Sequence, residues 1–223
     1  MDTYDRLYSE TSRARERFLA IPLVRQALSQ GGSPALYAGF LGEAYHHVKH
    51  TFRLLALAAS LTPDEDYQTA LFHYMQEERG HEKWILDDIR AIGGDADAVA
   101  AGRPGMACQI MVGHAYYAIE HVSPYTMLGM VHVLEGLSVQ LAHKVASAVQ
   151  QSMDTDGKRG FSYLNSHGAL DVEHVEMFRT LVNRLTDPAT QDIIISSANI
   201  MYRLYGAIFE DLGEQHGIGN HAA

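Results

Sequence analysis

The chain has 223 residues, and its 27 Asp and Glu against 17 Lys and Arg give a formal net charge of −10. An acidic balance without a basic stripe argues against a nucleic-acid partner, and no run approaches the ~18 apolar residues of a membrane span. The single cysteine, Cys108, excludes an internal disulfide and favours a reducing compartment. Since the polar N-terminus also shows no secretory signal, we expect a cytoplasmic protein.

Helical patterns account for most of the chain, and alternating strand patterns are absent. Start signals (Pro22, Ser33-Pro34, Ser123-Pro124, Asp187-Pro188) and stop signals (Gly31-Gly32, Gly93-Gly94) divide these patterns. They predict helices over residues 4–19, 22–31, 33–61, 64–92, 106–121, 123–153, 161–185 and 187–212. No loop is long enough to separate domains. We therefore expect one all-α bundle of seven or eight helices over residues 1–223, with a flexible tail over 213–223.

The first motif that carries chemistry lies in the predicted helix 64–92. Glu78 and His81 are three residues apart, so a helix projects them from one face. An inward-facing Glu-x-x-His is how helical di-iron carboxylate proteins present metal ligands. The pair is weak evidence alone, because Glu and His also share solvated helix faces.

A second stripe follows in the predicted helix 161–185. His167, Asp171 and His174 recur at spacings of four and three, and Leu170 and Phe178 keep their side of the helix near the core. Two imidazoles and a carboxylate form a mixed ligand set suited to iron or manganese. The alternative is a hydrogen-bonded polar seam.

Glu135 is a lone carboxylate in an apolar stretch between Val131 and Leu137. Burying it is costly unless it is bound to a metal or paired with a Lys or Arg. The two motifs and Glu135 together offer three carboxylates and three imidazoles from three helices, a plausible inventory for two iron ions.

A further stripe, Glu43, His47 and His50, lies in the predicted helix 33–61. Its spacings of four and three again place the side chains on one face. We expect these residues, together with Tyr74 and Glu77 of the predicted helix 64–92, either to hold the ligands from outside or to form a wall of the substrate site.

These motifs, in this order and with Glu135 more than fifty residues after His81, resemble the haem-oxygenase-like di-iron oxidases and oxygenases. The closest pattern is that of the fatty-acid decarboxylases that form 1-undecene. The stretches YHHVKHT (residues 45–51) and EERGHEKW (residues 77–84) also resemble this superfamily, which includes thiaminase-II-like proteins and the pyrroloquinoline-quinone-forming oxidase.

The resemblance spans residues 33–212 and implies a haem-oxygenase-like fold. It implies iron as cofactor, two ions per chain with one held weakly until substrate binds, and dioxygen as co-substrate. The implied metal ligands are Glu78, His81, Glu135, His167, Asp171 and His174. The implied substrate is a small carboxylate, of the fatty-acid or amino-acid type, for which Lys49, Arg53 or Arg203 could supply the counter-charge.

This sequence departs from the pattern in several places. Other members of the branch place the first Glu seven residues before the His; here that position is Tyr74, so Glu78 must serve, with Glu77 as a substitute. Thiaminase-II chemistry needs an activated Cys, and nothing beside Cys108 marks it as one. Haem oxygenases need an N-terminal axial His, and no histidine precedes His46.

Three functions are consistent with these observations. The leading one is a non-haem di-iron enzyme, expected to be a homodimer. The second is cofactor-free acid–base chemistry by His and Tyr on the same fold, as in the quinone-forming oxidase, or a thiaminase-like hydrolysis. The third is a non-catalytic, ligand-binding helical dimer whose histidines form a buried polar network.

Overall fold

The computed structural model describes residues 2–154 and 159–219, except for the side chains of residues 167–174. All regular structure in this part of the chain is helical. The helices are α1 (Thr3–Glu10), α2 (Ser12–Ala20), α3 (Pro22–Ser29), α4 (Pro34–Val48), α5 (Thr51–Leu61), α6 (Glu65–Glu78), α7 (His81–Ala91), α8 (Ala96–Ala101), α9 (Met106–His121), α10 (Thr126–Ser152), α11 (Ser162–Arg184) and α12 (Pro188–Gln215). The predicted all-α class is confirmed.

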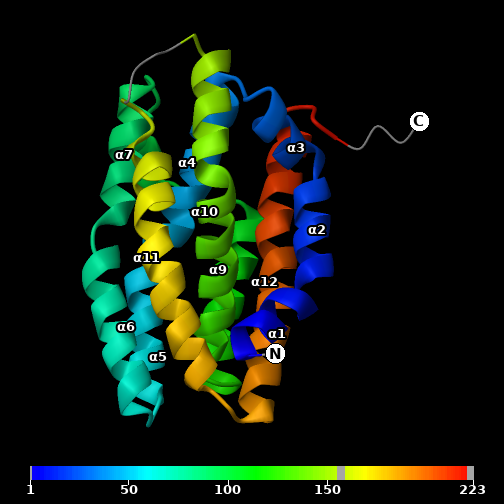
Figure 1. The fold of residues 1–223 in the computed structure, drawn as a ribbon. Helices are drawn as coiled ribbons and strands as arrows, with labels where there is room; N and C mark the ends of the chain where they lie inside the picture. Colours follow the sequence, from blue (N-terminus) through cyan, green and yellow to red (C-terminus); the bar gives the residue numbers. More distant parts are fainter. Residues whose placement is uncertain (1, 155–158, 220–223) are drawn as a thin grey trace.

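The chain runs up and down one long axis (Figure 1). In that view α4 and α5 descend, α6 and α7 return upward, and α9 descends again. The three longest helices then alternate: α10 rises, α11 descends and α12 rises. α10 packs against both α11 and α12, while α5 packs on α6 and α4 on α7. Among the described residues, no helix combines the length and the hydropathy that crossing a membrane requires.

Several predicted start signals work as capping theory requires. The Ser33 side chain accepts a hydrogen bond from the backbone N–H of Leu36, with Pro34 at the first position of α4. Asp187 accepts the N–H of Thr190 in the same way at the start of α12. These caps satisfy N–H groups that the first helical turn leaves without partners.

The structure has more helices than the seven or eight predicted. Three predicted helices are each split in two: 4–19 at Thr11, 33–61 at Lys49–His50, and 64–92 at Arg79–Gly80. The short α8 lies in a segment predicted as loop. α10 begins at Thr126 rather than near residue 123, and α12 continues to Gln215, three residues into the predicted tail.

The break between α6 and α7 has a clear local cause. Arg79 is extended, with ψ 111°, and Gly80 has φ +97°. This left-handed conformation is available to glycine without the Cβ strain that other residues meet. The two residues therefore interrupt the i→i+4 hydrogen bonding without a proline.

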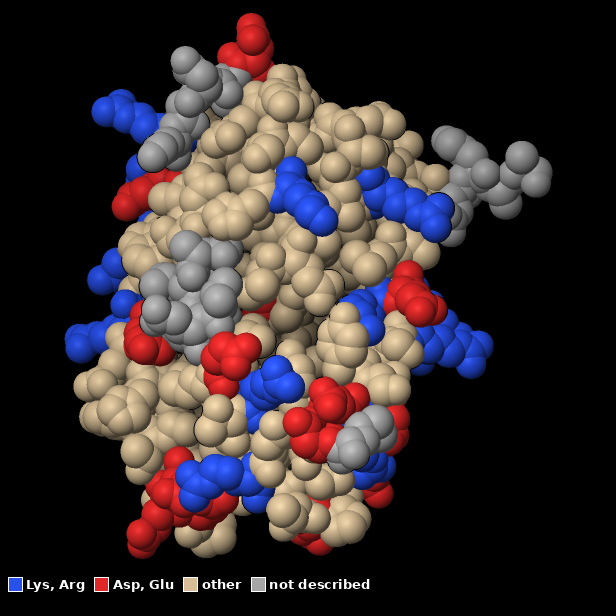
Figure 2. Space-filling model, in the orientation of Figure 1, with Lys and Arg blue, Asp and Glu red and all other residues tan. Residues whose placement is uncertain are grey.

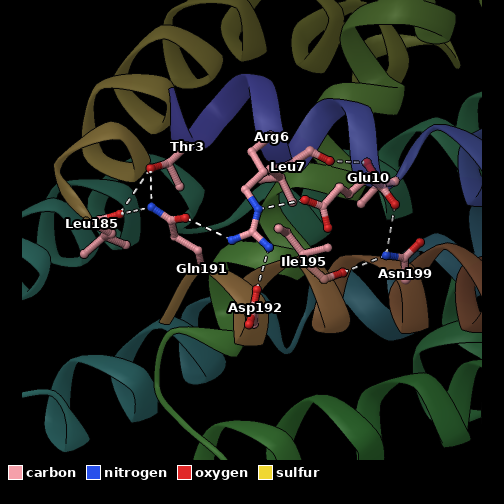
Figure 3. A network of polar contacts seen from close by, with 10 residues as sticks. Thr3, Arg6, Leu7, Glu10, Leu185, Gln191, Asp192, Ile195 and Asn199 are labelled. Carbon is pink, nitrogen blue, oxygen red and sulfur yellow. Dashed lines mark hydrogen bonds and ion pairs between the residues drawn. The ribbon is translucent and has the colours of Figure 1, made fainter. Parts of the chain in front are cut away.

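The N-terminal helix is tied to the end of the bundle by polar contacts (Figure 3). The Thr3 hydroxyl donates to the backbone oxygen of Leu185 over 3.1 Å. Arg6 donates to Gln191 Oε1 over 3.0 Å and to Asp192 Oδ1 over 2.6 Å. Together these bonds hold α1 against the connection between α11 and α12.

Candidate metal centre

Glu78 and His81 meet at the break between α6 and α7. Glu78 is the last residue of α6 and His81 the first of α7, so the predicted continuous helix through both is wrong. The turn nevertheless brings His81 Nδ1 to 3.3 Å from Glu78 Oε2. Both side chains are buried, with exposed fractions of 5% and 3%. The His81 ring also stacks on Trp84, with ring centroids 4.2 Å apart.

The second carboxylate oxygen of Glu78 fits a metal ligand. Oε1 is buried and accepts no hydrogen bond from any residue that the structure describes. A buried carboxylate oxygen without a donor is costly, and a bound cation would satisfy it. An imidazole nitrogen beside it completes a donor pair suited to iron.

Glu135 lies in the first half of α10 and lines the same cavity as Glu78. It is half-buried, flanked by the apolar residues Leu134 and Leu137 that also line the cavity. The sequence placed these two carboxylates on different helices, and in the fold both line one cavity.

The stripe His167, Asp171 and His174 lies on α11, but these three side chains fall outside the described residues. Leu164, three residues before position 167, lines the cavity. Among the side chains that the structure describes, no group of three or more His, Cys, Asp or Glu is placed to hold a metal. The role of the α11 residues stays a prediction.

Two residues predicted for the surroundings of the ligands also face the cavity. His47, at the end of α4, is buried, and its ring meets Tyr205 edge-on with centroids 5.8 Å apart. Tyr74 is buried one turn before Glu78. Both line the cavity, and so do Thr51 and Tyr205, which the sequence patterns did not single out.

The other three predicted wall residues do not line this cavity. Glu43 Oε1 accepts the backbone N–H of Gly105 over 2.9 Å, so its carboxylate sits at the N-terminus of α9. His50 Nδ1 is 3.0 Å from the Tyr116 hydroxyl. Glu77 is exposed.

The cavity itself is long and mainly apolar, with a volume of about 160 Å³. Its α10 wall runs from Met127 to Val149, which corresponds to roughly 33 Å of helix. Glu78, His47, Tyr74 and Glu135 mark its polar part, and from there apolar side chains extend toward Val149. The surface over the upper part of α10 is largely uncharged in Figure 2, whereas acidic and basic groups alternate lower down.

The predicted substrate-anchoring cations lie elsewhere. Lys49 Nζ is 2.9 Å from His46 Nδ1 and sits over the Tyr45 ring. Arg53 and Arg203 are exposed. Because none of these three cations lines the cavity, a substrate carboxylate in it would not meet them.

Cys108 does not line the cavity either. It is buried on α9, and burial, helped by the nearby Glu43, raises the pKa of its thiol to about 12. A thiol held protonated in this way is a poor nucleophile. This geometry argues against thiaminase-type chemistry at Cys108.

Residues 38–206 match the model of a protein family described as iron-containing redox enzymes. This match covers most of the chain, and the chain belongs to that family. No curated protein matches it.

Solved structures share the fold across nearly the whole chain. A domain of unknown function with a haem-oxygenase-like fold from Shewanella denitrificans superposes with a TM-score of 0.87 at 22% identity, covering 100% of this chain and 97% of that one. A TenA homologue from Pseudomonas syringae gives 0.76 at 16%, covering 95% and 93%. Haem oxygenase from Leptospira interrogans gives 0.76 at 15%, covering 95% and 100%. The fold is therefore haem-oxygenase-like.

Proposed function

We propose that this protein is a non-haem di-iron oxidase or oxygenase that uses dioxygen to oxidise a carboxylate-bearing substrate with a long apolar tail. The observation that carries the proposal is the buried Oε1 of Glu78, which accepts no hydrogen bond from any described residue. Glu78 lies beside His81 and lines an apolar cavity, in a member of an iron redox family. Iron satisfies that oxygen, and the cavity admits an apolar molecule.

Six residues would hold the iron: Glu78, His81 and Glu135, together with His167, Asp171 and His174 of α11. Bound iron supplies the ability to activate dioxygen, which amino-acid side chains lack. The protein holds the substrate in place and keeps water away from it. The apolar walls that α10 contributes serve both purposes.

The shape of the cavity favours a fatty-acid type of substrate over an amino-acid type. Its wall extends along most of α10 and is predominantly apolar, so a short polar substrate would leave most of it unfilled. The carboxylate belongs at the polar part, where His47 and Tyr74 can donate hydrogen bonds. Decarboxylation, as in the 1-undecene-forming enzymes, is one outcome; desaturation and hydroxylation are others.

Binding of metal and of substrate should depend on each other. Glu78 and Glu135 would repel a carboxylate in a cavity with little polar surface, unless cations neutralise them. Fatty acid should therefore bind tightly only to the metal-loaded protein, and it should raise the affinity for iron by the same factor.

The decisive test compares two adjacent glutamates. Glu78→Gln removes a buried carboxylate, whereas Glu77→Gln removes an exposed one from the same turn. Ferrous iron is added anaerobically to the parent and both variants, and bound iron is counted with and without a long-chain fatty acid. The parent and Glu77→Gln should take up about two ions per chain with fatty acid present, and Glu78→Gln should take up fewer.

Other outcomes would overturn the proposal. Absence of iron uptake by the parent would exclude it; fatty-acid binding without metal would then favour cofactor-free chemistry on this fold. Binding of neither would favour the non-catalytic alternative. If Glu78→Gln takes up as much iron as the parent and Glu77→Gln, Glu78 is not a metal ligand.

A further inference from the structure

Asp88 connects α7, which carries His81, with α11, which carries the predicted ligand stripe. It lies on α7, seven residues after His81, and only 2% of it is exposed. Its Oδ1 accepts the backbone N–H of Ser162 over 3.0 Å and the Ser162 hydroxyl over 2.7 Å. Its Oδ2 accepts the N–H of Tyr163 over 2.8 Å. A carboxylate of α7 thus caps the first turn of α11.

This cap substitutes for one that α11 lacks. The residue at its own N-cap position, Phe161, makes no side-chain cap hydrogen bond. A carboxylate at a helix N-terminus interacts favourably with the helix dipole, and hydrogen bonds to a charged acceptor are the stronger kind. Both carboxylate oxygens are engaged, so α11 cannot slide along α7 without losing these bonds.

The surroundings of the cap leave little room for movement. Tyr37 of α4 donates to the backbone oxygen of Gly160 over 2.8 Å, and its ring stacks on Phe161 with centroids 4.9 Å apart. A Cβ added at Gly160 would lie 2.5 Å from the Ile92 side chain. The start of α11 is therefore fitted closely against α4 and the end of α7.

The cap sets the relative height of the two helices. α7 rises and α11 descends in Figure 1, and the two are in contact. Going back seven residues from Asp88 to His81 covers roughly 10.5 Å of helix. Because α11 runs in the opposite direction, the same distance forward along α11 from Ser162–Tyr163 ends at positions 169–170. These positions lie between the predicted ligand positions 167 and 171. His81 therefore lies level with the middle of the predicted ligand stripe.

We propose that Asp88 is a positioning residue, whose bonds to the first turn of α11 set the axial register in which His81 meets the ligands of α11. This inference rests on the proposed function, because it takes the α11 stripe as metal ligands. Asp88 itself does not line the cavity. Its effect would pass through the backbone of α11.

The test uses Asp88→Asn, which keeps the side-chain volume but replaces one acceptor oxygen with a donor. The matched control is Asp187→Asn, which alters the N-cap of α12, where the donors to the carboxylate are also a backbone N–H and a hydroxyl, both of Thr190. Affinity for ferrous iron is measured anaerobically at a temperature where all proteins are folded. We expect Asp88→Asn to weaken it roughly tenfold to a hundredfold, as loss of an outer support of a metal site typically does. Asp187→Asn should leave it within about twofold, because its cap lies at the other end of the bundle.

A second measurement needs no metal. Amide hydrogen exchange along α7 and α11 should accelerate in Asp88→Asn and stay at the parent rate in Asp187→Asn. If the parent takes up no iron while hydrogen exchange changes as expected, the proposed function fails. Asp88 would then still fix the axial register of α11 against α7, but not for the purpose of binding a metal. Unchanged exchange in Asp88→Asn, unchanged iron affinity, or equal weakening by both variants would overturn the inference.

Discussion

Gly80 and Gly113 both stand where an added Cβ would meet no atom within 4 Å, but only Gly80 has a positive φ. Gly80→Ala forces an alanine into the left-handed region and should destabilise the protein by roughly 1–2 kcal/mol. Gly113→Ala places alanine inside the regular helix α9 and should stabilise it by up to about 1 kcal/mol. Urea unfolding of the two variants should therefore show a lower free energy of unfolding for Gly80→Ala and a higher one for Gly113→Ala than for the parent. A shift in the same direction for both would contradict the role of the turn.

His132 should give the protein an acid-sensitive stability. Burial, helped by the charge of Arg15, lowers the pKa of His132 from 6.5 to about 4 in the folded protein. Between these two pH values the unfolded chain takes up a proton that the folded one refuses, so stability falls as pH falls from 6.5 to 4 and the loss levels off below.

The size of this effect is roughly 3 kcal/mol. His132→Gln should flatten the fall by up to that amount, measured as unfolding free energy against pH relative to the parent. His46, His50 and His114, whose pKa values are also lowered, would leave part of the slope in place. An identical slope in parent and variant would show that His132 does not cause it.

At the scale of single residues, sequence spacing found Glu78 and His81 because three-residue spacing brings side chains together even across a broken helix. It did not find Asp88. The partners of Asp88 lie more than seventy residues away, and only tertiary packing brings them together. Nor did it show that Glu43 caps α9, since that bond also joins separate helices.

Helices differ in how clearly the sequence marks their ends. The starts at Ser33-Pro34 and Asp187-Pro188 were predicted well, because the cap is local chemistry. At Ser123-Pro124 the prediction was three residues early, because the N-cap of α10 is Tyr125. The Gly80 break was missed because a glycine inside a helical pattern is also tolerated there. The Lys49–His50 break contains neither Gly nor Pro, so nothing local announces it.

The attachment of α1 should depend more on apolar contact than on charge. Leu7 is fully buried, whereas Arg6 is partly exposed despite its three partners. Leu7→Ala should cost roughly 2–5 kcal/mol of unfolding free energy. Arg6→Ala should cost less, and its effect should shrink as salt rises. Chemical denaturation at low and high salt measures both. A salt-independent loss in Arg6→Ala as large as that of Leu7→Ala would contradict this ranking.

Considered as a whole molecule, the all-α architecture followed from apolar periodicity, which the sequence shows directly. The cavity could not be predicted in this way, because the residues that line it, such as Leu23, Leu36 and Val149, come from helices far apart in the chain. These positions look like ordinary core residues in the sequence. Only the packed bundle shows that the core is incompletely filled.

Two alanines on α10 test the extent of that unfilled space. Ala142 lines the cavity, whereas Ala146, one turn further on, is buried outside it. Ala142→Leu has room and should leave stability nearly unchanged while weakening the binding of long fatty acids more than of short ones. Ala146→Leu should overpack the core and cost roughly 1–3 kcal/mol.

Competition between fatty acids of graded length for the metal-loaded protein measures the length dependence of binding. Chemical denaturation of both variants measures their stability. Equal binding of all lengths by Ala142→Leu would show that the substrate tail does not reach this part of the cavity. Equal losses of stability in the two variants would contradict the inference that the cavity has room for a larger side chain at position 142.

The stacking of Trp84 on His81 has a practical consequence. Trp84 is the only tryptophan in the chain, so all indole emission comes from one ring, whose centroid is 4.2 Å from that of the proposed metal ligand His81. A paramagnetic ion bound there would quench that emission, and a diamagnetic one such as zinc would quench it far less. If iron binds at His81 as proposed, the fluorescence of Trp84 would report how much of the site is occupied, in dilute solution and without an added label.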